Sequence, residues 1–132
     1  MKNKYLCSHC KKEINVDNEI VLIAKNDLGE KGLVFLKTKL GDYSSKFSSG
    51  FSVAEGDKVT FSCPICHHNL TNKKNNQLAH FIQEDENKKQ FHIIISQIYG
   101  ENCTYKLEEQ KIVETFGDHL SRYQNPDCFL LV

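Results

Sequence analysis

Apolar and polar side chains alternate along much of this chain of 132 residues, and a period of two is typical of β-strands with one buried face. The runs that show it predict strands at residues 19–25, 33–37, 58–62, 77–83, 90–97 and 112–116. Turn-forming residues 26–32 predict a long hairpin loop between the first two, and the Gly- and Ser-rich residues 41–50 predict an exposed connection. We therefore expect a mostly β protein.

The second half of the chain has the pattern of an antiparallel β-meander. Centring the polar turn on Glu86 places Phe81 opposite Phe91, which pairs apolar with apolar on one face of the sheet. The same register places His80 opposite His92. Two histidines without a nearby carboxylate or cysteine form a poor metal site, so we expect the pair to lie on the wetter face.

The last strands of the meander lead into a short C-terminal segment. A three-residue turn over residues 100–102 places Ile95 opposite Leu107, and Gly117 ends the final strand. Residues 118–123 predict one helical turn, because Asp at its first position is a good N-cap. The apolar residues 128–132 are expected to dock on the core or on a second chain.

The candidate chemistry lies in two C-x-x-C turns. Cys7 and Cys10 form the first, Cys63 and Cys66 form the second, and 52 residues separate the two pairs. Each tight turn brings two thiolates to neighbouring corners of a tetrahedron about 2.3 Å from a zinc ion. Closing a loop of this length costs about 4 kcal/mol, whereas a structural zinc site supplies roughly 10 to 16 kcal/mol. The spacing therefore predicts one four-cysteine zinc site.

The surroundings of the two turns repeat as well. An aromatic residue precedes the first cysteine of each pair by two positions (Tyr5 and Phe61), and an aliphatic residue follows the second by four (Ile14 and Leu70). At these residues the chain resembles the zinc-ribbon superfamily, in which two cysteine knuckles on separate hairpins grip one ion. Ribbon knuckles usually continue with glycine, but here Lys11 and His67 follow, so the left-handed bend after each pair stays an open point.

The chain also looks like a group of small uncharacterised bacterial zinc-ribbon proteins, through the phrase from Phe61 to Cys66 and the phrase from Phe116 to Asp118. This resemblance implies no activity. It implies a zinc-ribbon-like region with an inserted β-hairpin at residues 1–76. A β-meander region at residues 77–132 would pack on it as one compact unit, with a short C-terminal helix or tail.

Other interpretations of the cysteines are weaker. Cys63 to His67 matches the haem-attachment motif C-x-x-C-H, which leaves the first pair unexplained. A thioredoxin-like dithiol needs a helix after the pair, but residues 69–76 lack helical periodicity. Iron in a rubredoxin-like site uses the same four thiolates, and four unbound buried thiols are a further alternative.

The remaining cysteines, histidines and aromatic residues have simpler expected roles. Cys103 and Cys128 stand alone, and each is expected to be a small core hydrophobe. His9, His67 and His68 adjoin the cysteine pairs and are expected to be solvated. The aromatic side chains of the Ser-rich connection, Tyr43, Phe47 and Phe51, are expected to pin it to the sheet.

Composition and charge narrow the classes of partner. The chain has 17 basic and 17 acidic residues, and Arg122 is the only arginine. Guanine is usually read by a bidentate guanidinium, so sequence-specific DNA binding is poorly supported. No apolar run approaches the roughly 20 residues that span a bilayer, and residues 1–7 lack the apolar stretch of a secretory signal. We expect a cytoplasmic protein with no membrane contact, whose cysteines stay reduced.

These observations favour a binding or adaptor module over an enzyme. Four protein ligands leave a metal no open position for substrate, and the sequence has no phosphate-binding glycine loop and no nucleophile elbow. The expected partner is another protein, contacted through exposed apolar residues of the Ser-rich connection or of the C-terminal tail. A redox-sensing zinc switch and a nonspecific nucleic-acid-binding zinc ribbon are the alternatives; zero net charge disfavours the second.

Overall fold

The computed structural model describes residues 3–73, 75–109 and 111–118, and these residues form strands, turns and loops without a helix. The strands are β1 (Lys4–Cys7), β2 (Asn15–Val16), β3 (Glu19–Lys25), β4 (Lys31–Lys37), β5 (Lys46–Phe47), β6 (Thr60–Ser62), β7 (Leu78–Glu84), β8 (Gln90–Ser96), β9 (Thr104–Glu108) and β10 (Lys111–Phe116). The prediction of a mostly β protein is confirmed. In the described part of the chain, no helix is long and apolar enough to cross a membrane.

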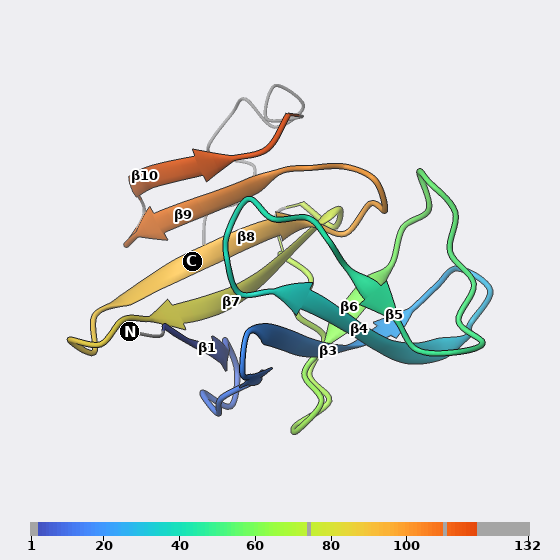
Figure 1. Ribbon diagram of the computed structural model, residues 1–132, viewed down its shortest axis with the longest axis horizontal. Coiled ribbons are helices and arrows are strands. Elements are labelled where there is room, and N and C mark those ends of the chain that lie inside the picture. Colours follow the sequence, from blue (N-terminus) through green and yellow to red (C-terminus); the bar gives the residue numbers. More distant parts are fainter. Residues whose placement is uncertain (1–2, 74, 110, 119–132) are drawn as a thin grey trace.

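Two antiparallel sheets make up the fold (Figure 1). Sheet A has the order β1-β7-β8-β9-β10, so the N-terminal strand joins the edge of the predicted meander. Sheet B has the order β2-β3-β4-β5, and β6 pairs with β3 on the side that β2 also occupies. The N-terminal strand therefore belongs to one sheet, and the inserted hairpin β3–β4 belongs to the other.

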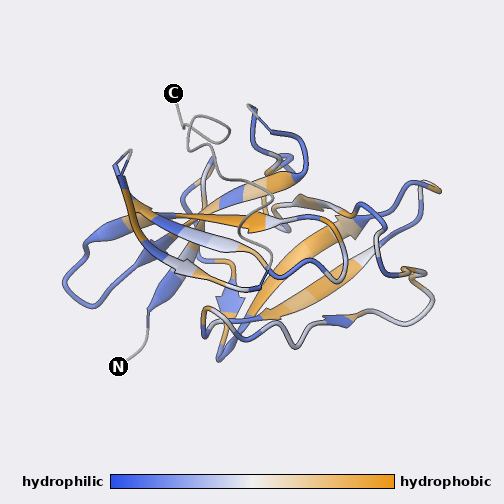
Figure 2. Cartoon of the chain, turned by 90° about the horizontal axis from the view of Figure 1, so that it is seen from above, coloured by the Kyte–Doolittle hydropathy of each residue, from blue (hydrophilic) through white to orange (hydrophobic). Residues whose placement is uncertain are grey.

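The main core lies between the two sheets, where the hydrophobic strands face one another (Figure 2). From sheet A it contains Phe81 and Ile93, which are opposite one another on β7 and β8. From sheet B it contains Ile20, Leu22 and Val34, each at most 1% exposed. These positions follow the period-two pattern of the sequence, which is why the strands themselves were predictable.

The predicted register of β7 against β8 is wrong by two residues. Phe81 pairs with Ile93 and not with Phe91. The connecting loop is centred on Asn87 because Asp85 organises it: its carboxylate accepts the backbone N–H groups of Asn87 and Lys89. A slip of two residues keeps every side chain on its predicted face, so the core composition is unaffected.

The predicted pairing of Ile95 with Leu107 is also wrong, since Ile95 pairs with Thr104. The connection between β8 and β9 is longer than three residues. Within it, Ile98 leaves the hairpin and forms an isolated bridge with Lys58. The last strand, β10, agrees with its prediction, whereas the predicted helical turn and the apolar segment 128–132 extend beyond the described residues.

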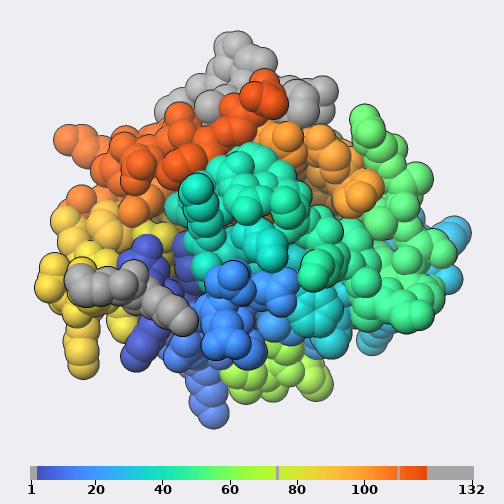
Figure 3. All heavy atoms as spheres, in the orientation of Figure 1, coloured from blue at the N-terminus to red at the C-terminus, as the bar shows by residue number. Residues whose placement is uncertain are grey.

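The connection between β4 and β6 is held against the core, as predicted for its aromatic residues. Phe47 and Phe51 pack on the core cluster, and their rings stack with centroids 5.2 Å apart. The Tyr43 hydroxyl lies 2.8 Å from the hydroxyl of Thr104 on β9. In Figure 3 this connection covers the front of the molecule between the two sheets.

Candidate metal centre

The first cysteine turn follows directly from β1. Its backbone closes because the N–H of Lys11 donates to the Cys7 carbonyl oxygen at 3.0 Å. Inside the turn, the N–H groups of His9 and Cys10 point at the Cys7 sulfur, at 3.2 and 3.3 Å. Backbone N–H groups aimed at a sulfur favour its thiolate form, which is the form that binds metals.

The second cysteine turn repeats this geometry after β6. The N–H of His67 donates to the Cys63 carbonyl oxygen at 2.9 Å. The N–H groups of Ile65 and Cys66 lie 3.3 and 3.4 Å from the Cys63 sulfur. The short repeat in the sequence is thus also a repeat in structure: in each turn, the corresponding two N–H groups point at the sulfur of the first cysteine.

Left-handed backbone follows both turns although neither has glycine there. Lys11 has a φ of 64° and His67 a φ of 65°. This conformation costs a non-glycine residue free energy, so the surrounding hydrogen bonds must hold it. The open point raised by the missing glycines is resolved, because both bends form.

Apolar side chains anchor each turn to the core. Tyr5 and Phe61 precede the turns, Ile14 and Leu70 follow them, and each is at most 5% exposed. A backbone hydrogen bond joins each flanking pair: Ile14 N–H to the Tyr5 carbonyl at 2.8 Å, and Leu70 N–H to the Phe61 carbonyl at 2.9 Å. The sequence repeat therefore predicted the anchors as well as the cysteines.

The first turn follows a strand of sheet A and the second follows a strand of sheet B, and residues of β7 contact both segments. In sheet A, Cys7 pairs with Phe81 of β7. The peptide of His80 contacts both turns, because its N–H donates to the Leu70 carbonyl at 2.9 Å and its carbonyl accepts the Ser8 hydroxyl at 3.2 Å. Sequence reasoning missed this contact, since on β7 it is made by backbone atoms and no side-chain pattern of that strand marks it.

The four sulfur atoms form one cluster. All lie within 4.8 Å of one another, and the Cys7–Cys66 and Cys10–Cys63 sulfur distances are both 3.8 Å. A tetrahedron of thiolates about 2.3 Å from a zinc ion has edges of about 3.8 Å. A disulfide needs about 2.05 Å, so these are thiols at metal-site spacing. The cluster can hold one metal ion.

Burial differs across the cluster. Cys7 and Cys63 are fully buried, Cys10 is half-buried and Cys66 is exposed. Burial raises the pKa of the Cys7 thiol to about 12 and raises that of Cys63 in the same direction. The pKa of Cys10 is lowered because the Lys12 N–H donates to its sulfur. A cation at the centre offsets the cost of burying negative sulfur, so the donor set fits a bound metal.

The histidines beside the turns are exposed, as predicted. None joins the sulfur cluster. His9 and His68, one from each turn, stack with ring centroids 4.0 Å apart and planes 10° from parallel.

The His80 and His92 side chains meet, but diagonally and not opposite one another. Their ring nitrogens Nε2 and Nδ1 are 2.8 Å apart, while in the strands His80 faces Ile94. The pair does lie on the less buried face, as expected: both histidines are half-buried, whereas Ala79, Phe81 and Ile93 on the opposite face are fully buried. Leu78 and Ile94 are nevertheless fully buried on the histidine face. Among the described residues, the four cysteines are the only group of three or more potential ligands within reach of one ion.

Of the two lone cysteines, Cys103 is buried in the second apolar cluster, in agreement with its prediction, and Cys128 lies outside the described residues.

Comparison of the chain with protein-family models, with curated proteins and with solved structures finds no match. The case for function therefore depends on the geometry of the site and its surroundings.

Proposed function

We propose that Cys7, Cys10, Cys63 and Cys66 hold one structural zinc ion, and that the chain is a zinc-ribbon-like binding module. The observation that carries the proposal is the set of 3.8 Å distances between sulfurs of different turns. Four thiolates complete the preferred coordination of zinc, so no position is left for a substrate or a reactive water. The proposal also places the chain in a reducing compartment, where thiols remain available to the metal.

Metal analysis of the purified protein tests this assignment. The expected result is one zinc per chain after purification in reducing buffer. Replacing zinc by Co²⁺ provides a second readout, because tetrahedral cobalt bound to thiolates has intense charge-transfer and visible absorption bands. Iron at one per chain would support a rubredoxin-like site, and no bound metal together with unchanged stability in chelator would refute the proposal.

The partner surface that we propose is the outer edge of sheet A. Five of the six residues of β10 are exposed, including Ile112 at 38% and Val113 at 46%. In the described part of the chain no strand pairs with that edge. An exposed edge strand with apolar side chains is suited to accept a strand from another protein. The aromatic residues of the Ser-rich connection are less suitable, because they pack on the core.

Affinity capture from the native cell tests this surface with a matched pair of variants. Val113→Lys places a charge on β10, and Leu28→Lys places the same charge on an 81% exposed residue of the β3–β4 loop. A protein captured by the parent chain should be lost with Val113→Lys and retained with Leu28→Lys. Equal capture by both variants would contradict an interaction through this edge.

A redox-sensing zinc switch is the second candidate, and the exposure of Cys66 favours it. An accessible zinc-bound thiolate keeps part of its reactivity toward peroxide. Oxidation would form a disulfide in each turn, reduce the peroxide to water and release the zinc. Reversible zinc release at low peroxide would support the switch, and retention of zinc under these conditions would support a purely structural ion.

A further inference from the structure

The face of sheet A that points away from sheet B carries a second apolar cluster. The register of β7, β8 and β9 places Leu78, Ile94, Tyr105 and Leu107 on this face, because residues opposite one another, and residues two apart on one strand, share a face. Cys103, in the loop before β9, joins them. We call these five residues the outer cluster; neither the zinc site nor the β10 edge assigns them a role.

The outer cluster is shielded from water as completely as the main core, since each of its residues is at most 3% exposed. Side chains stand roughly perpendicular to a sheet, so neighbours on one face cover the flanks of one another but not the ends. A sheet face buried to this extent needs a second layer of chain over it. The layer stops before β10, where Ile112, the partner of Leu107, is 38% exposed.

Among the described residues, sheet B contributes no side chain to this cluster. Its side chains pack in the main core, and the outer cluster contains residues of sheet A and of the loop before β9 alone. The first cysteine turn lies at one end of the face. There the Ser8 hydroxyl donates to the His80 carbonyl oxygen, and Lys11 is close enough to His80 and His92 for its charge to act on both rings. Residues outside the described ranges are the remaining source of cover for the outer cluster.

The chain leaves its last described strand beside this face. At the end of β10, Phe116 lies opposite Thr104, the residue before Tyr105. Fourteen residues follow Asp118, and an extended chain of that length spans up to about 46 Å. β7 lies three strand spacings from β10, which is about 14 Å. The end of the chain is therefore long enough to reach every residue of the outer cluster.

The end of the chain also has the composition that an apolar face requires. Residues 128–132 are five consecutive apolar residues, Cys-Phe-Leu-Leu-Val, and the nine residues before them are mostly polar. A polar connection followed by an apolar run suits a segment that first crosses solvent and then packs on a sheet. The other positions outside the described ranges, 1–2, 74 and 110, are single residues or a pair and are too short to form a layer.

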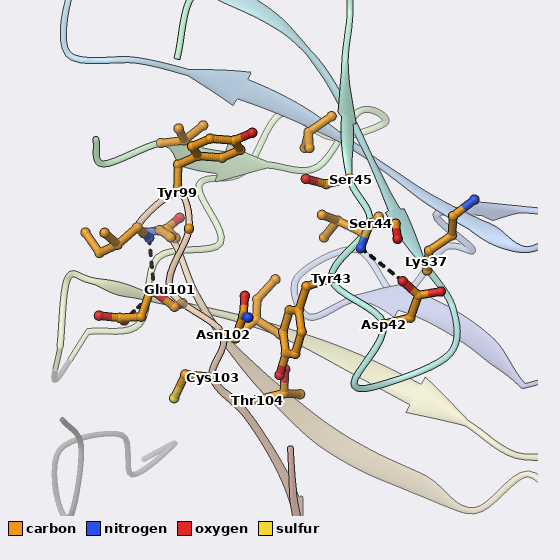
Figure 4. A pocket seen from close by; sticks show the side chains of 18 of the residues that line it. Lys37, Asp42, Tyr43, Ser44, Ser45, Tyr99, Glu101, Asn102, Cys103 and Thr104 are labelled. Atoms are coloured by element: carbon orange, nitrogen blue, oxygen red, sulfur yellow. Dashed lines mark hydrogen bonds between the residues drawn. The ribbon is translucent and has the colours of Figure 1, made fainter. Parts of the chain in front are cut away.

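A cavity of about 410 Å³ between the two sheets is a second apolar space near the end of β10 (Figure 4). Tyr43 and Thr104 line it, and Asp118 is close enough to Tyr43 for its charge to act on the hydroxyl. Its wall includes Ile95, which follows Ile94 on β8 and points to the opposite face. Ile95 is only half-buried, whereas Ile94 is fully buried. Burial therefore favours the outer face over the cavity as the place where the segment packs.

From this arrangement we infer that residues 119–132 cross the outer face of sheet A in the same molecule, and that residues 128–132 pack on the outer cluster. The apolar side chains gain from leaving water. A segment tethered to its own sheet has a high effective concentration there, so it is preferred to the same segment of a second copy. The outer face is thus occupied within the chain, and a partner protein is left with the β10 edge. The inference does not depend on the metal.

Nuclear Overhauser effects between methyl groups test the inference on the full-length chain as purified. They are expected from residues 128–132 to Ile94 and Leu107, and not to Ile95. A sample that mixes labelled with unlabelled chains identifies contacts between molecules, and the effects should be absent from it. Effects to Ile95 would place the segment in the cavity, and effects only between molecules would assign the face to a second copy. Either result, or no effect from residues 128–132 to sheet A, overturns the inference.

Two double variants measure what the segment contributes to stability. Alternate side chains of an extended segment face the same way, so Phe129→Ser with Leu131→Ser, and Leu130→Ser with Val132→Ser, sample both of its sides. At least one double variant should lower the melting temperature by about 10 °C. Leu28→Ser, at an 81% exposed residue of the β3–β4 loop, is the control and should not change it. Two double variants that melt like the control would refute the inference. Metal content should stay the same in all three proteins, which separates this test from that of the zinc site.

Discussion

Replacing Cys63 by serine is the sharpest single perturbation of the proposed centre. Its sulfur is fully buried, lies 3.8 Å from the Cys10 sulfur and accepts two backbone N–H groups. A serine oxygen is closer to the backbone and is a harder ligand than sulfur, so it fits a thiolate tetrahedron poorly. We expect Cys63→Ser to lose the metal ion.

The expected loss of stability follows from the length of the loop that the proposed ion closes. The two cysteine pairs are separated by 52 residues, and closing a loop of that length costs about 4 kcal/mol. Without the ion only the packing of the sheets offsets this cost, so the free energy of unfolding should fall by at least about this amount. For a domain whose whole stability is roughly 5–15 kcal/mol, the melting temperature should fall by at least about 12 °C.

The assay combines metal content with thermal unfolding followed by circular dichroism. Cys103→Ala is the matched control, because Cys103 is a buried cysteine outside the sulfur cluster. It should keep one metal ion per chain and lose only a small packing contribution, on the order of 1 kcal/mol. Cys63→Ser protein that retains a full metal ion, or that loses it without a fall in melting temperature, would refute the reasoning.

Three further predictions concern pH, backbone conformation and charge. Burial lowers the pKa of His80 from 6.5 to about 4, so the neutral form of His80 stabilises the fold fully above pH 6.5. About 3 kcal/mol of the free energy of unfolding should be lost as the pH falls toward 4, and urea unfolding of the His80→Gln variant should show a smaller loss. Gly117→Ala should lower the free energy of unfolding by more than 2 kcal/mol in the same assay, because φ is +107° and an added Cβ meets the Asn102 carbonyl oxygen. Gly50→Ala, at a φ of +86° in open space, should cost less, and equal costs would refute the contact. Polynucleotides should not bind below micromolar concentration at physiological salt, given zero net charge; filter binding with a salt series measures this, and tight, steeply salt-dependent binding would contradict it.

The strands and the cysteine cluster were predictable because local signals mark them. Period-two alternation located β3 and β10 closely, and paired C-x-x-C turns with repeated flanking residues located all four sulfurs of the cluster. Spacing alone carries this information, since a two-residue gap within each pair sets the sulfur distance and an aromatic residue two positions earlier supplies the anchor.

The features that were missed depend on contacts between distant parts of the chain. β1 has only four residues, so nothing in its sequence selects β7 as its partner. The β7–β8 register was missed because Asp85 lengthens the loop through hydrogen bonds to backbone N–H groups. The cavity was invisible for the same reason, as its walls come from segments on both sheets and are defined only after these segments pack.

The pairing of β1 with β7 also sets an order of events when the chain is made. Lys4 pairs with Glu84, so the first strand waits for a partner that is synthesised much later. At about 5–20 residues per second, this wait lasts roughly 4–16 seconds on the ribosome. For most of this time Cys7 and Cys10 lack the second pair, which follows at residues 63 and 66. An ion in the proposed site would therefore join segments that are made far apart in time, and long-range closure of this kind makes folding slow.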